Sequence, residues 1–180
     1  ERRTKLALAT DAVRAFLGRL ALGGEEGEAR GDRAAVIAFN EAAERLAPLT
    51  HERALLDAAL DRLDTAPLTC IACGLELAIA ELTPAARRPG ATPVIVLLTD
   101  GRSNPRPIAE SEALAAAVRV DGIVLFTIAL GDDAEHEALA RMASEPGFAY
   151  RAPTAADLAS IYQAVAGAIP CPGSAYWGGR

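Results

Sequence analysis

The sequence predicts an α/β fold in which a mostly parallel central sheet is covered by helices on both faces. Along the chain, segments with apolar residues at helical spacing alternate with short apolar runs, the pattern of sheet strands joined by helices. Runs such as 94–98 and 123–130 are almost entirely apolar, which is typical of strands buried on both faces. With 180 residues, 51% of them hydrophobic, the chain is long enough for one domain with a substantial core.

The first half of the chain predicts three helices and two strands. The expected helices cover 6–20, 51–63 and 71–82, and the expected strands cover 34–39 and 45–49. The first helix ends before Gly23-Gly24, and a charged, glycine-rich loop follows it. Pro48 cannot donate a ladder hydrogen bond, so we expect the strand that contains it at a sheet edge.

The second half repeats a simpler strand and helix unit. Its expected elements are a strand at 93–98, a helix at 109–120, a strand at 122–130, a helix at 134–143, a strand at 148–151 and a helix at 155–169. In such sheets the ligand crevice lies outside the carboxyl ends of the strands, so functional residues are expected in the loops that follow them. The composition changes after residue 169, so we assign 1–169 to the domain and 170–180 to a tail or linker.

Composition and motifs exclude several classes of function. The 24 acidic residues outnumber the 18 basic ones, which are scattered, so a nucleic acid is not expected as a partner. The apolar runs are far shorter than the roughly 20 residues that span a bilayer. The chain contains no G-x-x-x-x-G-K-[ST], and no G-x-G-x-x-G follows its first strand, which disfavours a nucleotide-binding enzyme.

Asp100 is the best candidate for a functional residue. It stands in Val94-Ile95-Val96-Leu97-Leu98-Thr99-Asp100-Gly101, where a buried strand brings a carboxylate to its carboxyl end and a glycine allows the chain to turn. The alternative is a structural Asx turn that holds the following loop. Asp132 and Asp133 follow a later strand and are expected to cap the next helix.

Two motifs together resemble those of the von Willebrand factor type A family. They are Pro67-Leu68-Thr69-Cys70-Ile71-Ala72-Cys73-Gly74-Leu75-Glu76-Leu77-Ala78 and Leu97-Leu98-Thr99-Asp100-Gly101-Arg102-Ser103-Asn104. The order of the elements also agrees with the family from the first helix to the last. The resemblance implies a Rossmann-like fold and a binding or adhesion module rather than an enzyme.

The resemblance further implies a metal-ion-dependent adhesion site. In such a site a hard divalent cation, Mg²⁺ or Mn²⁺, is held by oxygen ligands, and an acidic residue of a protein partner completes the coordination. Thr69 and Asp100 would then be metal ligands, and the neighbouring Arg102, Ser103 and Asn104 would contact the partner. Thr69 can also be the N-cap of the helix after it.

The sequence departs from the family at its start. The family begins with a central strand that ends in Asp-x-Ser-x-Ser, whereas this sequence opens within the following helix and contains no such motif. We therefore expect an N-terminally truncated fold that lacks this strand and its metal-binding loop. With only Thr69 and Asp100 as ligands, metal binding is expected to be weak or absent.

The cysteines form the other notable pattern, because Cys70 and Cys73 make a C-x-x-C at the start of a helix. A thiol-redox domain is one interpretation, since a helix N-terminus favours a thiolate. We favour a structural disulfide in which Cys171 pairs with Cys70 or Cys73. Such a bridge would suit an extracytoplasmic or cell-surface domain.

Overall fold

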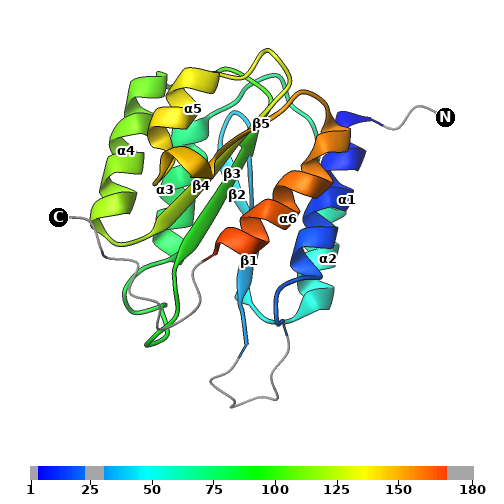
Figure 1. Cartoon of the computed structure of the whole chain (residues 1–180), viewed down its shortest axis with the longest axis vertical. Coiled ribbons are helices and arrows are strands. Elements are labelled where there is room, and N and C mark those ends of the chain that lie inside the picture. The colour runs from blue at the N-terminus through cyan, green and yellow to red at the C-terminus, as the bar shows by residue number, and fades with distance from the viewer. Residues whose placement is uncertain (1–3, 23–30, 170–180) are drawn as a thin grey trace.

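The computed structural model describes residues 4–22 and 31–169, and its centre is a parallel sheet (Figure 1). The sheet consists of β3 (Val94–Thr99), β4 (Val124–Leu130) and β5 (Ala149–Ala152), in the order β3-β4-β5. All three strands run in parallel, with Val94 opposite Val124 and Thr127 opposite Ala149. Their carboxyl ends therefore meet at one edge, where the sequence predicts the functional loops.

Helices cover both faces of this sheet, as predicted (Figure 1). One face carries α1 (Lys5–Leu17) and α6 (Leu158–Ala168), and the other carries α3 (Ile71–Glu81), α4 (Ile108–Val120) and α5 (His136–Met142). Every residue of β4 is buried, and its side chains alternate between the two cores. Phe126 and Ile128 pack toward α1 and α6, whereas Leu125 and Ala129 pack toward the opposite helices.

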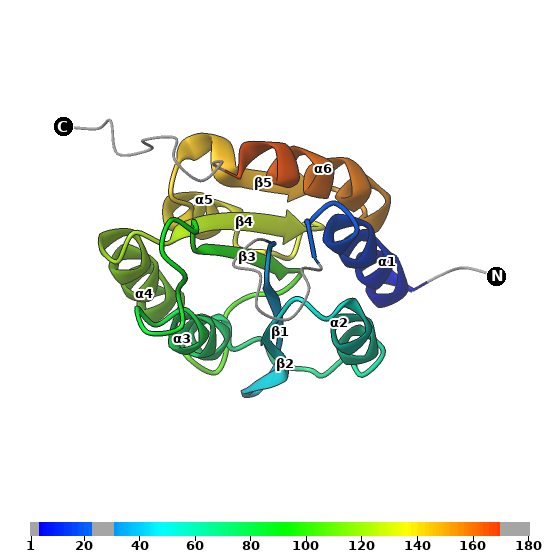
Figure 2. The same ribbon diagram turned by 90° about the horizontal axis from the view of Figure 1, so that it is seen from below.

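The strands β1 (Ala34–Phe39) and β2 (Ala43–Thr50) form a separate antiparallel hairpin, which is followed by α2 (Arg53–Leu60). Figure 2 shows the hairpin on the β3 side of the parallel sheet, away from β5. Within the described residues, the hairpin shares no ladder hydrogen bonds with the parallel sheet. The apolar run of β1 is typical of a strand that is buried on both faces, but Val36 is its one fully buried residue.

Pro48 lies at an irregular point of the hairpin. The pairing of Val36 with Ala47 and of Ala34 with Thr50 leaves an extra residue on β2, so the ladder bulges beside the proline. In the described part of the chain, β2 pairs with β1 alone and forms an edge, which confirms the position expected for Pro48.

The hairpin is fastened to α3 at both ends of that helix. At the carboxyl end of α3, the carboxylate of Glu81 binds Arg45 and accepts a hydrogen bond from the Leu49 backbone nitrogen at 3.1 Å. At its start, the Cys70 backbone nitrogen donates to the Asn40 carbonyl at 2.5 Å. These contacts fix the position of α3, and therefore of the loop before it, relative to the hairpin.

Several helices have different bounds from those expected, and α2 is shorter than the expected 51–63 at both ends. The first helix ends at Leu17, before the expected residue 20, and Gly18 is its C-cap. The expected helix at 155–169 is a 3₁₀ turn, Ala155–Asp157, followed by α6. None of the helices in the described ranges is long and apolar enough to cross a membrane. Residues 170–180 lie outside the described residues, so the boundary of the tail stays a prediction.

Candidate functional site

Asp100 stands at the carboxyl edge of the sheet, directly after β3, where the sequence predicts it. Thr99 is buried and its hydroxyl accepts a hydrogen bond from the Gly101 backbone nitrogen at 3.3 Å, which holds the start of the loop. The Asp100 side chain is exposed, and its carboxylate has no hydrogen-bond or ion-pair partner within the described ranges. The carboxylate is therefore available to a ligand and does not tie down its own loop.

The loop that contains Thr69 lies against the loop that contains Asp100. Thr69 and Asn104 form an isolated antiparallel bridge with backbone hydrogen bonds of 3.2 and 3.0 Å. The Thr69 side chain contacts Gly101, where a β-carbon would lie 2.6 Å from the Thr69 Oγ1 atom. The two predicted motifs thus meet at one edge, and the glycine is required by close approach, since its φ is not positive.

The loop after Asp100 is held by hydrogen bonds within the loop and by one hydrogen bond to Glu135, just before α5. The Ser103 backbone nitrogen donates to Glu135 Oε2 at 3.0 Å, and the Ser103 hydroxyl donates to the Arg106 carbonyl at 2.8 Å. Asn104 Nδ2 donates to the Arg102 carbonyl at 3.0 Å. Glu135 was not predicted from the sequence; it is the residue before α5 and holds the loop from outside.

Glu135 also occupies the N-cap position of α5, with no side-chain capping hydrogen bond. The expectation that Asp132 or Asp133 caps this helix is therefore wrong. Both aspartates are exposed and lie in the bend that precedes Glu135.

Arg106 clamps the end of the loop to two helices. Its Nη1 and Nη2 atoms donate to the two carboxylate oxygens of Glu76 on α3, each at 2.7 Å, and its Nε donates to Glu110 on α4 at 2.6 Å. The hydrogen bonds with Arg106 lower the pKa of Glu76 below its usual value. Those with Glu76 first, and Glu110 second, raise the pKa of Arg106. This clamp could not be predicted from the sequence, because an arginine in a polar loop normally faces solvent.

The start of α3 differs from the prediction in two respects. Cys70, not Thr69, is the N-cap, and its sulfur accepts a hydrogen bond from the Cys73 backbone nitrogen at 3.3 Å. Cys70 and Cys73 form a disulfide with each other, which corrects the expectation that either pairs with Cys171. Their Cα atoms are 5.2 Å apart in the first helical turn, a separation that suits a disulfide. Cys171 lies outside the described residues.

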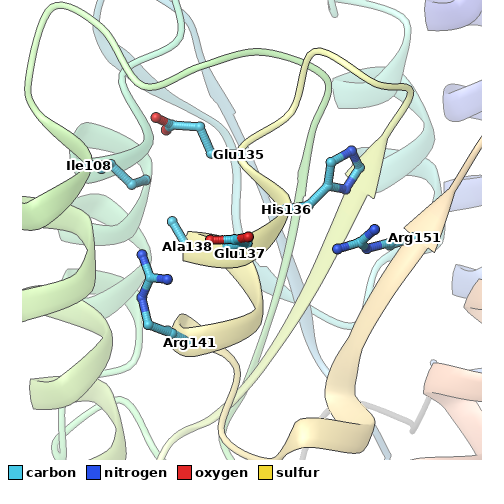
Figure 3. A pocket seen from close by; sticks show the side chains of 7 residues that line it. All are labelled: Ile108, Glu135, His136, Glu137, Ala138, Arg141 and Arg151. Atoms are coloured by element: carbon cyan, nitrogen blue, oxygen red, sulfur yellow. The ribbon is translucent and has the colours of Figure 1, made fainter.

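A pocket of about 440 Å³ opens beside this edge, along α5 (Figure 3). It is lined by Ile108, Glu135, His136, Glu137, Ala138, Arg141 and Arg151. His136 and Arg151 lie together on one side of the pocket, across from Arg141 (Figure 3). Arg141 is paired with Glu112. The Nδ1 atom of His136 is buried and has no hydrogen-bond partner among the described residues. The sequence does not reveal this pocket next to the site.

A model of a known family matches most of the chain. The model of the von Willebrand factor type A domain matches residues 2–164. The chain belongs to this family. A comparison of this vWA domain with curated proteins gives no match.

Solved structures with the same fold include matrix and pilus proteins. Proximal thread matrix protein 1 of the mussel byssus, with a zinc-occupied adhesion-site motif, is 24% identical with a TM-score of 0.76. The match covers 88% of this chain but 39% of the mussel protein, so the vWA domain spans less than half of that protein's length. The vWF domain of the type V pili tip protein Mfa5 from Porphyromonas gingivalis is 14% identical with a TM-score of 0.76, covering 90% and 87% of the two chains.

A third structure is the manganese-loaded TRAP protein of Plasmodium vivax. It is 14% identical to the vWA domain with a TM-score of 0.65, and the match covers 84% of this chain and 62% of that one. Because all three identities are low, these likenesses support the fold alone.

Some of the described residues at this edge would fit a divalent cation. Thr69 and Asp100 offer a hydroxyl and a carboxylate, donors that suit a hard cation such as Mg²⁺. Asn104 Oδ1 is a buried acceptor without a hydrogen-bond partner in the described part of the chain. No group of three or more His, Cys, Asp or Glu side chains is gathered for a metal among these residues. These donors fit the chemistry of a hard divalent cation.

Proposed function

We propose that this vWA domain is a non-enzymatic module that binds a protein partner through the loops at the carboxyl edge of its sheet. The observation that carries the proposal is the bridge between Thr69 and Asn104. The bridge brings the Thr69 hydroxyl into contact with Gly101. Gly101 directly follows Asp100, whose exposed carboxylate has no partner among the described residues. A divalent cation at this edge would be held by Thr69 and Asp100, and an acidic residue of the partner would complete its coordination.

Further ligands would be required for useful metal affinity. We propose that they come from a strand ending in Asp-x-Ser-x-Ser, placed between β1 and β3. In support, each of these two strands has one edge without a ladder partner in the described residues. Such a strand would end at the same edge as β3 and bring its aspartate and serines beside Thr69.

Two exposed arginines beside this edge suit an acidic partner. Arg102 and Arg151 are exposed, and neither has an ion-pair partner within the described residues. Arg151 faces the pocket beside α5 in Figure 3. Exposed, unpaired arginines next to a metal site would attract a partner's carboxylates and orient its approach.

The test is a calorimetric titration of Mg²⁺ and Mn²⁺ into two proteins. One is the 180-residue chain, and the other carries an additional upstream strand that ends in Asp-x-Ser-x-Ser. We expect weak binding by the first and much tighter binding by the second, because Mg²⁺ gives up its waters only to a sufficient number of oxygen ligands. In the longer protein, Thr69→Ala and Asp100→Ala should each abolish the gain.

Asp121→Asn is the matched control, because this exposed aspartate lies after α4, at the opposite end of the sheet. It should leave metal binding unchanged. Micromolar Mg²⁺ binding by the 180-residue chain that survives Asp100→Ala would place the metal elsewhere and contradict the proposal.

We further propose an extracytoplasmic or cell-surface location. The Cys70–Cys73 disulfide is typical of oxidising compartments, and the similar structures include a byssus matrix protein and a pilus tip protein. Labelling of intact source cells with a membrane-impermeant amine reagent should modify the protein. Labelling that requires cell lysis would contradict this location.

A further inference from the structure

The two sulfurs of the Cys70–Cys73 disulfide lie in different surroundings. Cys70 is fully buried at the N-cap of α3, with 0% of its surface exposed. Cys73 is partly exposed, one turn into the helix. It lines a pocket of about 350 Å³ together with Ala43, Glu76, Leu77 and Ala80. Cys73 is therefore the residue of the pair that a thiol from solvent can approach, whereas Cys70 is closed off from solvent.

The buried sulfur has the better environment for a leaving thiolate. Thiol–disulfide exchange proceeds when a thiolate attacks one sulfur and the other sulfur departs with the bonding electrons. Cys70 Sγ already accepts a hydrogen bond from the Cys73 backbone nitrogen at 3.3 Å. It also lies at the N-terminus of an 11-residue helix, where the helix dipole stabilises negative charge.

We propose that Cys70–Cys73 is a reactive disulfide that exchanges with external thiols at Cys73. An external thiolate forms a bond to Cys73 Sγ, the bond between Cys73 and Cys70 breaks, and Cys70 becomes a thiolate. A second external thiolate then attacks the external sulfur of the mixed disulfide and releases Cys73 as a thiolate. The net result is a two-electron reduction of the protein disulfide and the oxidation of two thiols to one disulfide.

The charge at the mouth of the pocket is consistent with anionic thiolates as reactants. Glu76 is the one acidic residue that lines the pocket, and its carboxylate is engaged on both oxygens by Arg106. This pairing offsets the negative charge that would otherwise repel an approaching thiolate.

The reaction site adjoins the proposed binding edge. Cys70 directly follows Thr69, and its backbone nitrogen is bonded to the Asn40 carbonyl. The disulfide therefore closes the helical turn that begins beside the Thr69 loop. The exchange uses neither Thr69 nor Asp100, so its chemistry is independent of the proposed metal site.

The test uses the folded chain with Cys171→Ser, so that only the pair can react. Protein with the intact disulfide is incubated with reduced glutathione, the reaction is stopped by acid and alkylation, and fragment mass spectrometry locates each modification. We expect glutathione on Cys73 and the alkyl group on Cys70, with circular dichroism showing a folded protein throughout. Glutathione on Cys70, or reduction that occurs only in denaturant, would overturn the proposal.

A second measurement does not depend on trapping the intermediate. The variants Cys70→Ser and Cys73→Ser, each in the Cys171→Ser background, leave one thiol of the pair. The rate of reaction with an aromatic disulfide reagent then reports access to that thiol. We expect Cys73 to react at least about tenfold faster than Cys70 in the folded proteins, and equal rates in denaturant. Equal rates in the folded proteins would show that the two sulfurs do not differ in access.

Discussion

The Thr69 hydroxyl lies in contact with Gly101, at a position where any β-carbon on residue 101 would be 2.6 Å from Oγ1. Real β-carbons essentially never approach an atom so closely, so either the loop or the threonine must move if residue 101 has a side chain. The contact thereby links the identity of one residue to the position of a candidate ligand on another loop. It explains why the Asp-Gly pair occurs at this strand end although the glycine has no positive φ.

Gly101→Ala should displace Thr69 and destabilise the domain. We expect a loss of about 1–3 kcal/mol in the free energy of unfolding, the usual cost of overpacking a filled site. Urea denaturation followed by circular dichroism measures it. In a Thr69→Ala background the same substitution should cost less, because the clashing oxygen is gone. Gly147→Ala is the control, since a β-carbon there meets nothing within 4 Å, and additive effects of the Gly101 and Thr69 substitutions would contradict the contact.

Gly74→Ala should be destabilising although alanine favours helices. A β-carbon at Gly74 would lie 2.8 Å from Cδ1 of Phe39, the last residue of β1. We expect the steric cost, about 1–3 kcal/mol, to exceed the helix-propensity gain of about 1 kcal/mol. Thermal unfolding of this variant is compared with that of Gly167→Ala in α6, where a β-carbon meets open space. The second variant should be more stable than the parent, and a stabilised Gly74→Ala would refute the predicted clash.

The clamp between Arg106 and Glu76 should be visible in an acid titration. Because Arg106 lowers the pKa of Glu76, the unfolded state takes up this proton at a higher pH than the folded state. The contribution to stability is therefore complete at neutral pH and is lost as the pH falls through the lowered pKa. In Arg106→Gln, NMR titration of the Glu76 carboxyl carbon should give a higher pKa than in the parent. An unchanged pKa of Glu76 would mean that the clamp does not persist in solution. The control is Arg62→Gln, which removes the partner of Glu44 and should leave the pKa of Glu76 unchanged.

Reduction of the Cys70–Cys73 disulfide should lower stability without unfolding the domain. For a loop this short, the chain-entropy relation gives about 2 kcal/mol. For a domain of this size, that corresponds to a fall of roughly 4–8 °C in Tm. Calorimetry with and without dithiothreitol on the Cys171→Ser protein measures the change. Cooperative unfolding should persist, because Ile71 and Leu75 of α3 remain packed in the core; its disappearance would show that the disulfide is essential to the fold.

The sequence predicts most of the parallel sheet because its signals are local. The continuous apolar run of β4, the Leu-Leu-Thr-Asp-Gly ending of β3 and the helical spacing of α3 and α4 each depend on a few neighbouring residues. The contact between the loop of Thr69 and the loop that follows β3 could be predicted as well, since the resembled family fixes which loops are neighbours. The same local reasoning fails where a feature depends on distant residues.

Three features of the site show this limit. Most residues of β1 are only partly buried, although β1 has the composition of an interior strand. The partner of a cysteine cannot be deduced from spacing alone, and the pair closed within one helical turn instead of reaching Cys171. Arg106 and Glu135 have the appearance of ordinary surface charges, and their roles follow from Glu76 and Ser103, which only the folded chain brings to them.

The contacts between Glu81 and the hairpin have a consequence for local unfolding of the domain. Only 10% of the Glu81 side chain is exposed, and it holds both Arg45 and the Leu49 amide of β2. If β2 were to detach alone, a nearly buried carboxylate would lose its partners, which is costly. The hairpin and the end of α3 are therefore expected to open together, as one cooperative unit in the sense of native-state hydrogen exchange. The Leu49 amide, on an edge strand, would then exchange with solvent as slowly as the amides of the last turn of α3.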